Sequence, residues 1–247
     1  MGKLLIIRHG HTELNMPGRD ERLRGWLDVP LDRAGLEEAA RTAEGISNIG
    51  TVDAIYCSDL RRARQTAEAL RKRTKASVTA TSDLRPWNLG VFCGQRVKDI
   101  LPFLNLLNQH LDLAAPSGES FYQFYGRYSH CLIELLRQAE ESVNCIAVVT
   151  HVRNLLATPS VITGSDIAKV PVKGGPHTGA VIAVERVLGQ WRFGGNHELV
   201  AGRDANVDAS LRAITPIECM VAHDEGRNPL RQVRARFRRR SLHFDNP

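Results

Sequence analysis

The sequence predicts a single α/β domain whose mostly parallel central sheet is covered by helices on both faces. Short apolar segments alternate along the chain with longer amphipathic segments, as strands and helices do in such sheets. Clusters of polar residues follow several of the apolar segments, which is where open α/β sheets bind ligands. The chain has 247 residues, enough to bury one large core. One domain with a ligand site at the end of its strands is therefore expected.

The first half of the chain is expected to begin with a buried strand over residues 3–7. Residues 31–46 follow as an amphipathic helix with Asp32 as its N-cap. The expected buried face of this helix consists of Leu36, Ala39, Ala43 and Ile46. Residues 54–57 then predict a second strand, and residues 59–73 predict a second helix.

The second half is expected to contain two helices, over residues 95–110 and 119–139. A central strand is predicted over residues 144–150, because buried parallel strands are apolar on both faces. A terminal hairpin is expected over residues 180–194, with its turn around Gly189.

The C-terminal part of the chain differs in charge from the rest. Residues 224–247 contain seven arginines and three acidic residues, a net charge of +4 out of +6 for the whole chain. We expect a domain over residues 1–200 and an Arg-rich extension over residues 201–247, either a short basic helix or a disordered arm. Such an extension could attract anionic surfaces. Specific nucleic-acid binding is not expected, because the extension lacks interleaved aromatic platforms or a known reading helix.

Composition also bears on the cellular location of the protein. The longest apolar runs are far shorter than the roughly 18 residues needed to span a bilayer, so no membrane segment is expected. Residues 1–10 pass directly into the first predicted strand without the pattern of a secretory signal. Five cysteines without a Cys-x-x-Cys pair indicate neither a disulfide framework nor a thiolate zinc site. A cytoplasmic protein with reduced thiols is expected.

Polar clusters at residues 8–15, 58–62 and 151–153 each follow a predicted strand. Their ends are expected to meet at one edge of the sheet, which would bring together Arg8, His9, Arg62 and His151. The guanidinium fork fits phosphate oxygens, and a neutral imidazole can attack phosphorus near neutral pH. These residue types therefore predict covalent phosphoryl transfer.

Five motifs occur in order along the chain. They are RHGHTELN at 8–15, LRGWLDVPLDRAGLEEA at 23–39, SDLRRARQTA at 58–67, PSGESF at 116–121 and VVTH at 148–151. Together they resemble the histidine phosphatase superfamily, in the branch with phosphoglycerate mutases, over residues 3–198. RHG alone would be a weak signal, but five ordered motifs in one chain are a strong one.

The resemblance implies a role for individual residues and no metal or cofactor. His9 would be the nucleophile that becomes phosphorylated. Arg8, Arg62 and His151 would hold the phosphate and offset charge in the transition state. The candidate substrate contacts are Asn15, His11, His177 and Thr178. Each contact has a structural alternative, since Asn15 could stabilise a turn, His11 could face solvent, and residues 177–178 could form an ordinary turn.

The chain departs from the family pattern at the proton donor. The family usually has a glutamate where this chain has Pro86, or an aspartate where it has Val152. General acid catalysis typically contributes about a hundredfold to ten-thousandfold in rate. Three explanations are open. Glu119 could donate the proton, the substrate could release a leaving group that needs none, or catalysis could be lost while the pocket still binds a ligand.

The sequence thus predicts a metal-independent phosphatase that hydrolyses phosphorylated small molecules or other phosphate esters through a phosphohistidine on His9. The alternative is a non-catalytic protein that binds a phosphorylated ligand or a partner. A mutase is less well supported, because residues 95–120 are mostly apolar where mutases usually carry longer, more basic insertions. The natural substrate and the oligomeric state stay open. The apolar residues at 100–113 could equally cover the pocket or form a dimer face.

Overall fold

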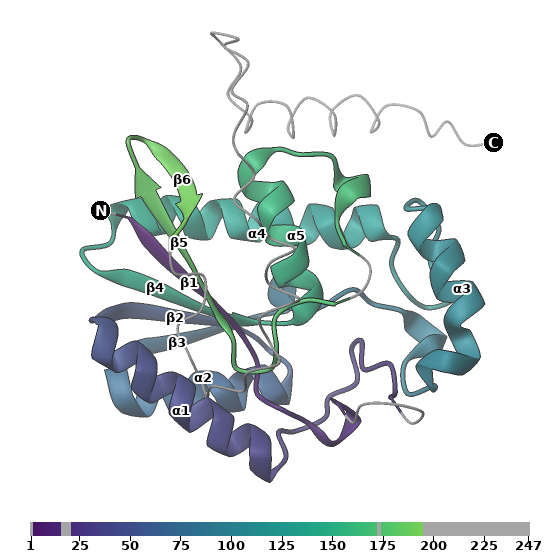
Figure 1. Cartoon of the computed structure of the whole chain (residues 1–247), viewed down its shortest axis with the longest axis horizontal. Helices are drawn as coiled ribbons and strands as arrows, with labels where there is room; N and C mark the ends of the chain where they lie inside the picture. The colour runs from purple at the N-terminus through teal and green to yellow at the C-terminus, as the bar shows by residue number, and fades with distance from the viewer. Residues whose placement is uncertain (1, 16–20, 172–173, 195–247) are drawn as a thin grey trace, which may run out of the picture.

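The computed structural model describes residues 2–15, 21–171 and 174–194. These residues form one α/β domain around a six-stranded sheet with strand order β3-β2-β4-β1-β5-β6 (Figure 1). The predicted extension over 201–247 and the predicted boundary at residue 200 lie outside the described residues. The predicted fold class, an α/β domain with a mostly parallel sheet, is confirmed by the described part of the chain.

Four neighbouring strands of the sheet run parallel, β3 to β2, β2 to β4 and β4 to β1. The last two strands, β5 and β6, form the predicted antiparallel hairpin, and β5 pairs with β1. The strand bounds are β1 Lys3–Arg8, β2 Val52–Ser58, β3 Ser77–Thr81, β4 Cys145–Thr150, β5 Val181–Val187 and β6 Gln190–Phe193. All six residues of β4 are buried, which agrees with its prediction as a central strand.

Helices cover both faces of the sheet (Figure 1). Their bounds are α1 Arg33–Ile49, α2 Arg61–Thr74, α3 Val97–Gln109, α4 Phe121–Glu141 and α5 Val152–Thr163. Side chains of β1 alternate between two cores, with Leu4 and Ile6 on the α4 and α5 face and Leu5 and Ile7 on the α1 and α2 face. The strand ends that carry polar residues are thus held between two layers of helices.

The N-terminus of α1 packs closely against the loop that follows β1. Asp32 caps the helix as predicted, since its side chain accepts a hydrogen bond from the Gly35 N–H at 2.8 Å. A Cβ on Gly35 would lie 2.0 Å from the His11 carbonyl oxygen, so only glycine permits this approach. The prediction that Leu36 belongs to the buried face is wrong, because the helix presents Gly35 to that loop and leaves Leu36 50% exposed.

Two further differences concern exposed segments. The edge strand β3 was not predicted, because its sequence SVTAT is short, contains only two apolar residues and is mostly exposed. Helix α3 buries Ile100 and Leu107 but leaves Phe103 53% exposed. The apolar segment at 100–113 is therefore only partly used in the core of the described residues.

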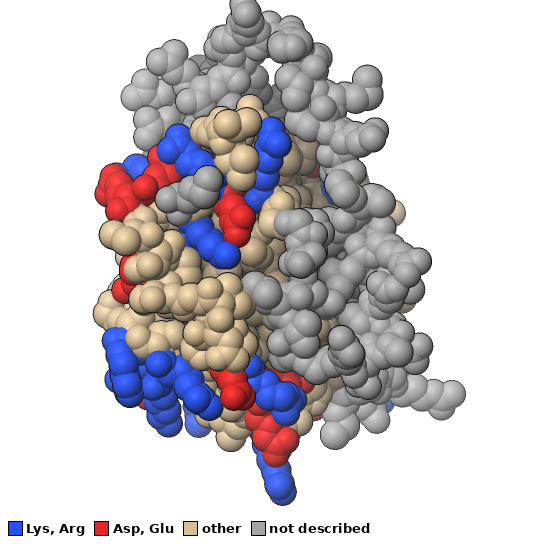
Figure 2. Space-filling model, turned by 60° about the vertical axis from the view of Figure 1, so that its left-hand side comes forward, with Lys and Arg blue, Asp and Glu red and all other residues tan. Residues whose placement is uncertain are grey.

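The surface of the described residues carries charges of both signs. On the face shown in Figure 2, acidic and basic side chains are interspersed, and one group of basic side chains lies at the lower left. Among the helices that the structure describes, none is long and apolar enough to cross a membrane.

Candidate active site

Two histidines lie side by side where β1 and β4 end. Arg8 pairs with Thr150 in the parallel register, so the residues that follow, His9 and His151, leave the sheet at the same level. The His9 N–H donates to the Thr150 carbonyl at 3.0 Å, which fixes the two chain segments together. The ring centroids are 5.0 Å apart with an interplanar angle of 61°. Both side chains are buried, with 2% of each residue exposed.

The His9 ring is oriented by a backbone carbonyl. Its Nδ1 lies 2.7 Å from the Gly10 carbonyl oxygen, which can only accept, so Nδ1 carries the proton and Nε2 has a free lone pair. Burial lowers the pKa of His9 well below its ordinary value, and the charges of Arg62 and Arg8 lower it further. His9 is therefore neutral near pH 7 and suited to act as a nucleophile through Nε2.

The His151 ring is buried without a polar partner. Neither Nδ1 nor Nε2 has a hydrogen-bond partner among the described residues. Its pKa is also lowered well below the usual value, first by burial and then by Arg62 and His9. Buried polar atoms are rarely left unpaired in native proteins, so this ring is available to a bound ligand.

Arg62 lies in the first turn of α2, where the sequence predicted it, and only 1% of it is exposed. Its two terminal nitrogens donate to the carbonyls of Leu27 at 2.6 Å and Gly25 at 2.9 Å, while Nε has no partner in the described part of the chain. Burial, followed by the charge of Arg24, lowers the pKa of Arg62 to about 9. The loop at 25–28 thus holds a buried cation in place without a carboxylate.

Arg8 is held in a similar way by the loop that precedes β5. One terminal nitrogen donates to the Pro176 carbonyl at 2.5 Å, and its buried Nε has no partner among the residues described. Burial and the charge of Arg24 lower the pKa of Arg8 to about 10. Arg8, His9, Arg62 and His151 are therefore brought together as predicted, and Arg8, Arg62 and His151 keep buried nitrogen atoms without a partner among the described residues.

Arg24 is a further member of this cluster that the sequence analysis did not single out. It donates to the Leu14 carbonyl at 3.1 Å, and burial lowers its pKa. Its charge lowers the pKa values of both histidines as well as those of the two buried arginines, Arg8 and Arg62. The available signal was its position directly before Gly25, inside the family motif at 23–39.

The predicted contacts Asn15 and His11 both take part in local structure. The Asn15 side-chain oxygen accepts from the Thr12 N–H at 3.0 Å and from the Thr12 hydroxyl at 2.8 Å, which closes the turn after β1. The His11 ring pairs with Asp32 at 2.5 Å, and the His11 N–H donates to Glu38 at 2.8 Å. Their direct contact with substrate stays a prediction.

The other predicted contacts, His177 and Thr178, lie in the loop before β5. The Thr178 hydroxyl donates to Glu38 at 3.1 Å, and His177 Nδ1 lies 2.7 Å from the Thr178 carbonyl oxygen. The next residue, Gly179, donates its N–H to the Arg8 carbonyl at 3.1 Å. The loop is thus attached to the strand end that carries His9, which supports its expected place beside the pocket.

Comparison with known sequences agrees with this constellation. The sequence profile of the histidine phosphatase superfamily (branch 1) matches residues 4–195. The chain belongs to this superfamily.

Individual relatives match parts of the chain. The phosphoglycerate mutase-like protein 4 of Arabidopsis thaliana is 32% identical over 157 residues, covering 60% of this chain and 66% of that protein. The broad-specificity phosphatase YOR283W of Saccharomyces cerevisiae is 30% identical over 155 residues, covering 60% and 65%. The chain thus spans slightly less than two thirds of the length of each of these relatives.

Solved structures match a larger share of the fold. Mycobacterial hydrolase 1 has a TM-score of 0.68 with 25% identity, covering 79% of this chain and 97% of that structure. A mycobacterial glucosyl-3-phosphoglycerate phosphatase in complex with VO3 has a TM-score of 0.66 with 25% identity, covering 78% and 98%. The histidine phosphatase fold therefore accounts for most of the described residues.

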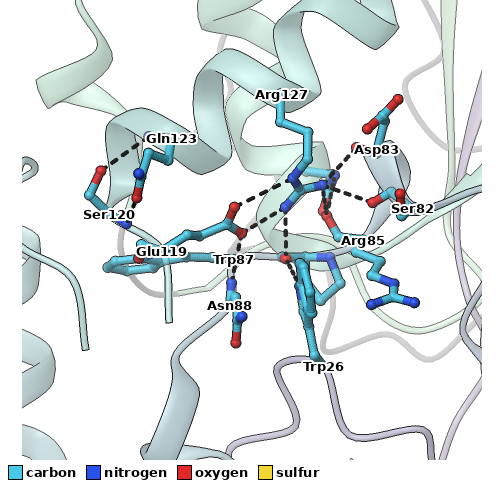
Figure 3. A network of polar contacts seen from close by, with 12 residues as sticks. Trp26, Ser82, Asp83, Arg85, Trp87, Asn88, Glu119, Ser120, Gln123 and Arg127 are labelled. Carbon is cyan, nitrogen blue, oxygen red and sulfur yellow. Dashed lines mark hydrogen bonds and ion pairs between the residues drawn. The ribbon is translucent and has the colours of Figure 1, made fainter. Parts of the chain in front are cut away.

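In this member of the superfamily, Pro86 lies at the position where the sequence analysis expected the superfamily's glutamate. Its carbonyl accepts hydrogen bonds from the Trp26 ring N–H at 2.8 Å and from Arg127 at 3.3 Å (Figure 3). Arg127, on α4, also donates to three backbone carbonyls of the same segment, those of Ser82, Asp83 and Arg85. One guanidinium thus binds the whole turn that leads to Pro86.

Glu119, the predicted alternative donor, belongs to the same network (Figure 3). One carboxylate oxygen accepts from Arg127 at 2.7 Å and from the Asn88 N–H at 2.9 Å. The Glu119 backbone carbonyl accepts from the Trp87 ring N–H at 2.8 Å. The side chain therefore serves as a hydrogen-bond acceptor in this arrangement, and its role as a proton donor stays a prediction.

Metal ligation was not expected from the sequence. Within the described ranges, no group of three or more His, Cys, Asp or Glu side chains could hold a metal ion. Independence of metal stays a prediction for activity measurements.

Proposed function

We propose that this protein is a phosphohydrolase that cleaves phosphorylated small molecules through a phosphohistidine on His9. One observation carries the proposal: the neutral His9 ring keeps Nδ1–H on the Gly10 carbonyl and a free Nε2 lone pair among the buried cations Arg8 and Arg62. Nucleophile and phosphate-binding groups therefore share one buried site.

The proposed reaction has two displacements at phosphorus. Nε2 attacks the phosphorus atom, a P–N bond forms, and the bond to the leaving oxygen breaks with its electron pair. Water then attacks the phosphohistidine, the P–N bond breaks, and Nε2 regains its lone pair as phosphate is released. The Gly10 carbonyl, which accepts from Nδ1–H, favours the positive charge on the phosphorylated ring.

Arginine charges would stabilise the transition state in both steps. Arg8 and Arg62 each keep a buried Nε without a partner in the described residues, and their terminal groups are fixed by backbone carbonyls. Fixed donors need little reorganisation when charge develops on the phosphoryl oxygens, which is usually the largest electrostatic contribution to catalysis.

This chain departs from the family pattern at the residue expected to protonate the leaving group. Three carboxylates near the site already accept hydrogen bonds: Glu38 from His11 and Thr178, Asp28 from the Arg61 N–H, and Glu119 from Arg127. We therefore propose that aryl, enol and acyl phosphates are preferred substrates, because their leaving groups are stable without protonation.

Relatives support a phosphatase. They include a broad-specificity phosphatase from yeast and a mycobacterial glucosyl-3-phosphoglycerate phosphatase that was solved with VO3. Other relatives carry mutase names, such as the phosphoglycerate mutase-like protein of Arabidopsis thaliana. The described α3 segment over 97–109 has one basic residue, Lys98, which gives little support for binding a bisphosphorylated primer.

The test is phosphate release from a series of acyl, aryl and alkyl phosphates by the wild type and by His9→Ala. We expect turnover that depends on His9, fastest for the better leaving groups, and an acid-labile phosphoprotein after rapid quenching. Equal turnover by His9→Ala would overturn the proposal. Binding of the same compounds without turnover would support the non-catalytic alternative, and rapid interconversion of phosphoglycerates with 2,3-bisphosphoglycerate would support a mutase.

A further inference from the structure

We propose that Glu38 is a positioning residue that assists the phosphorylation of His9 through the peptide group between Gly10 and His11. The inference rests on the proposed function for the step that Glu38 assists. It goes further by assigning a role to a carboxylate of α1 that the sequence analysis did not single out.

One peptide group lies between Glu38 and the nucleophile. Its N–H, that of His11, donates to Glu38 Oε2 at 2.8 Å. Its carbonyl, that of Gly10, accepts from His9 Nδ1–H at 2.7 Å. The two groups point to opposite sides of a trans peptide, so the carboxylate, the peptide and the imidazole form one chain of hydrogen bonds.

Such a chain strengthens the hydrogen bond at its far end. A carboxylate that accepts from a peptide N–H polarises the peptide and increases the partial negative charge on its carbonyl oxygen. The Gly10 carbonyl thereby becomes a better acceptor for His9 Nδ1–H. When Nε2 attacks phosphorus the ring gains positive charge, and a stronger acceptor at Nδ1 stabilises that charge. Glu38 can therefore favour the transition state without contact with the substrate.

Close packing keeps the peptide group in place. A Cβ on Gly10 would lie 2.5 Å from the Gly35 carbonyl oxygen, and a Cβ on Gly35 would lie 2.7 Å from the His11 backbone nitrogen. The segment that follows His9 is therefore packed against the first turn of α1, directly before Glu38. Hydrogen-bond partners that are fixed in this way need little reorganisation as charge develops on the ring.

Glu38 has a second oxygen and a second electrostatic neighbour. Its Oε1 accepts from the Thr178 hydroxyl at 3.1 Å, which attaches the loop before β5 to α1. Its charge also raises the pKa of Arg8, against the larger effect of burial. A test must therefore separate an action of Glu38 through His9 from an action through phosphate binding by Arg8.

The variant Glu38→Gln keeps the shape of the side chain and one acceptor oxygen but removes the negative charge. Glu37→Gln is the matched control, because Glu37 is the preceding residue on α1, is exposed and pairs with Arg33 at 3.3 Å. Rapid quenching with phenyl phosphate gives the rates at which the phosphohistidine forms and is hydrolysed. Calorimetry gives the affinity for inorganic phosphate, and NMR gives the resonance of the His9 Nδ1 proton.

We expect Glu38→Gln to slow formation of the phosphohistidine by about tenfold, the usual scale for removing a group that tunes a reacting imidazole. Hydrolysis of the phosphohistidine should not slow, because the positive ring is then less stable. The Nδ1 proton should move upfield, and Glu37→Gln should match the wild type throughout.

Two results would overturn the proposal. Equal slowing of both steps would indicate a general loss of alignment. Tighter binding of phosphate with an unchanged Nδ1 resonance would show that Glu38 acts through Arg8 instead.

Failure of the proposed function can be distinguished from failure of this inference. If no phosphoprotein forms on any substrate, the Nδ1 resonance is compared in the wild type, Glu38→Gln and Glu37→Gln without substrate. An upfield shift in Glu38→Gln alone would support the coupling of Glu38 to His9 in a non-catalytic protein. The same resonance in all three proteins would overturn it.

Discussion

His9 and His151 lie with ring centroids 5.0 Å apart because Arg8 and Thr150, the residues before them, are paired in the parallel strands β1 and β4. The sheet thereby places two imidazoles at one point without a direct hydrogen bond between their rings. Burial and the same cationic surroundings lower the pKa of each. The fold, rather than any local motif, makes the pair neutral and close.

This pair predicts a dependence of stability on pH. In the unfolded chain both histidines take up protons near pH 6.5, whereas in the folded protein their pKa values lie well below this. The unfolded state therefore binds more protons as the pH falls below 6.5, and the free energy of unfolding decreases, whereas above that pH this contribution is constant.

Urea denaturation between pH 8 and pH 5.5 checks the expected slope. Each histidine contributes up to about 1.4 kcal/mol per pH unit in the affected range. The double variant His9→Gln, His151→Gln should show a smaller slope, whatever its absolute stability. A slope identical to that of the wild type would contradict the account.

Removal of metal should leave the activity unchanged. In the proposed reaction, Arg8 and Arg62, which are fixed on backbone carbonyls, supply the positive charge that a metal would bring to the phosphoryl group. Turnover of phenyl phosphate is measured after exhaustive dialysis against a chelator and again after adding back divalent cations. Activity that is lost on dialysis and restored by a cation would show that the arginines alone are insufficient.

Arg62→Lys should impair both catalysis and folding. The single ammonium group of lysine cannot replace the planar guanidinium group of Arg62, whose two terminal nitrogens donate to the carbonyls of Gly25 and Leu27 and whose Nε is left for the substrate. We expect kcat/KM to fall by about a hundredfold to a thousandfold. We also expect stability to fall by about 1–3 kcal/mol as buried carbonyls lose their donors.

The neighbouring residue offers a matched control for that substitution. Arg61 is exposed, and the bond from its backbone N–H to Asp28 does not depend on its side chain. Arg61→Lys should therefore retain activity and melting temperature. Similar losses in both variants would mean that the first turn of α2 tolerates no lysine and that the Arg62 effect is not specific.

The sequence predicted the strands and helices whose residue types reflect which of their groups are buried or need a hydrogen-bond partner. Residues 144–150 are apolar because both faces of β4 are covered, and Asp32 precedes α1 because its side chain satisfies a free N–H. The edge strand β3 has no covered face to leave such a pattern. Leu36 was misplaced because the approach of Gly35 to His11, a contact between distant segments, decides which side of α1 faces inward.

The same distinction applies to the site. Arg8 ends a strand, His9 and His151 follow strands, and Arg62 lies in the first turn of a helix, so their positions can be predicted from element order. Arg24 lies in an irregular loop and donates to the Leu14 carbonyl, and such a loop has no periodicity from which its position could be predicted. Arg127 donates to backbone carbonyls about 40 residues earlier in the chain. Every residue has a backbone carbonyl, so the residue types give no indication of such a contact. The part of Arg127 in the turn at Pro86 could be found only in the structure.

The last prediction separates two roles for Glu119. If it protonates the leaving oxygen, Glu119→Gln should slow alkyl phosphates by about a hundredfold to ten-thousandfold and leave aryl phosphates with good leaving groups nearly unchanged. The contacts in Figure 3 favour another result, because the carboxylate is paired with Arg127 and accepts from the Asn88 N–H.

We expect Glu119→Gln to lower the melting temperature and to reduce turnover of alkyl and aryl phosphates by the same modest factor. Arg127→Lys should reproduce this pattern although it leaves the carboxylate in place, because it removes the donors to the carbonyls at 82–86. A rate loss confined to alkyl phosphates in Glu119→Gln and absent in Arg127→Lys would instead identify Glu119 as the proton donor. Both variants disturb the same network, but only Arg127→Lys keeps the Glu119 carboxylic acid. Their comparison therefore decides between two roles of Glu119: holding the turn at Pro86 in place, or donating the proton in place of the missing glutamate.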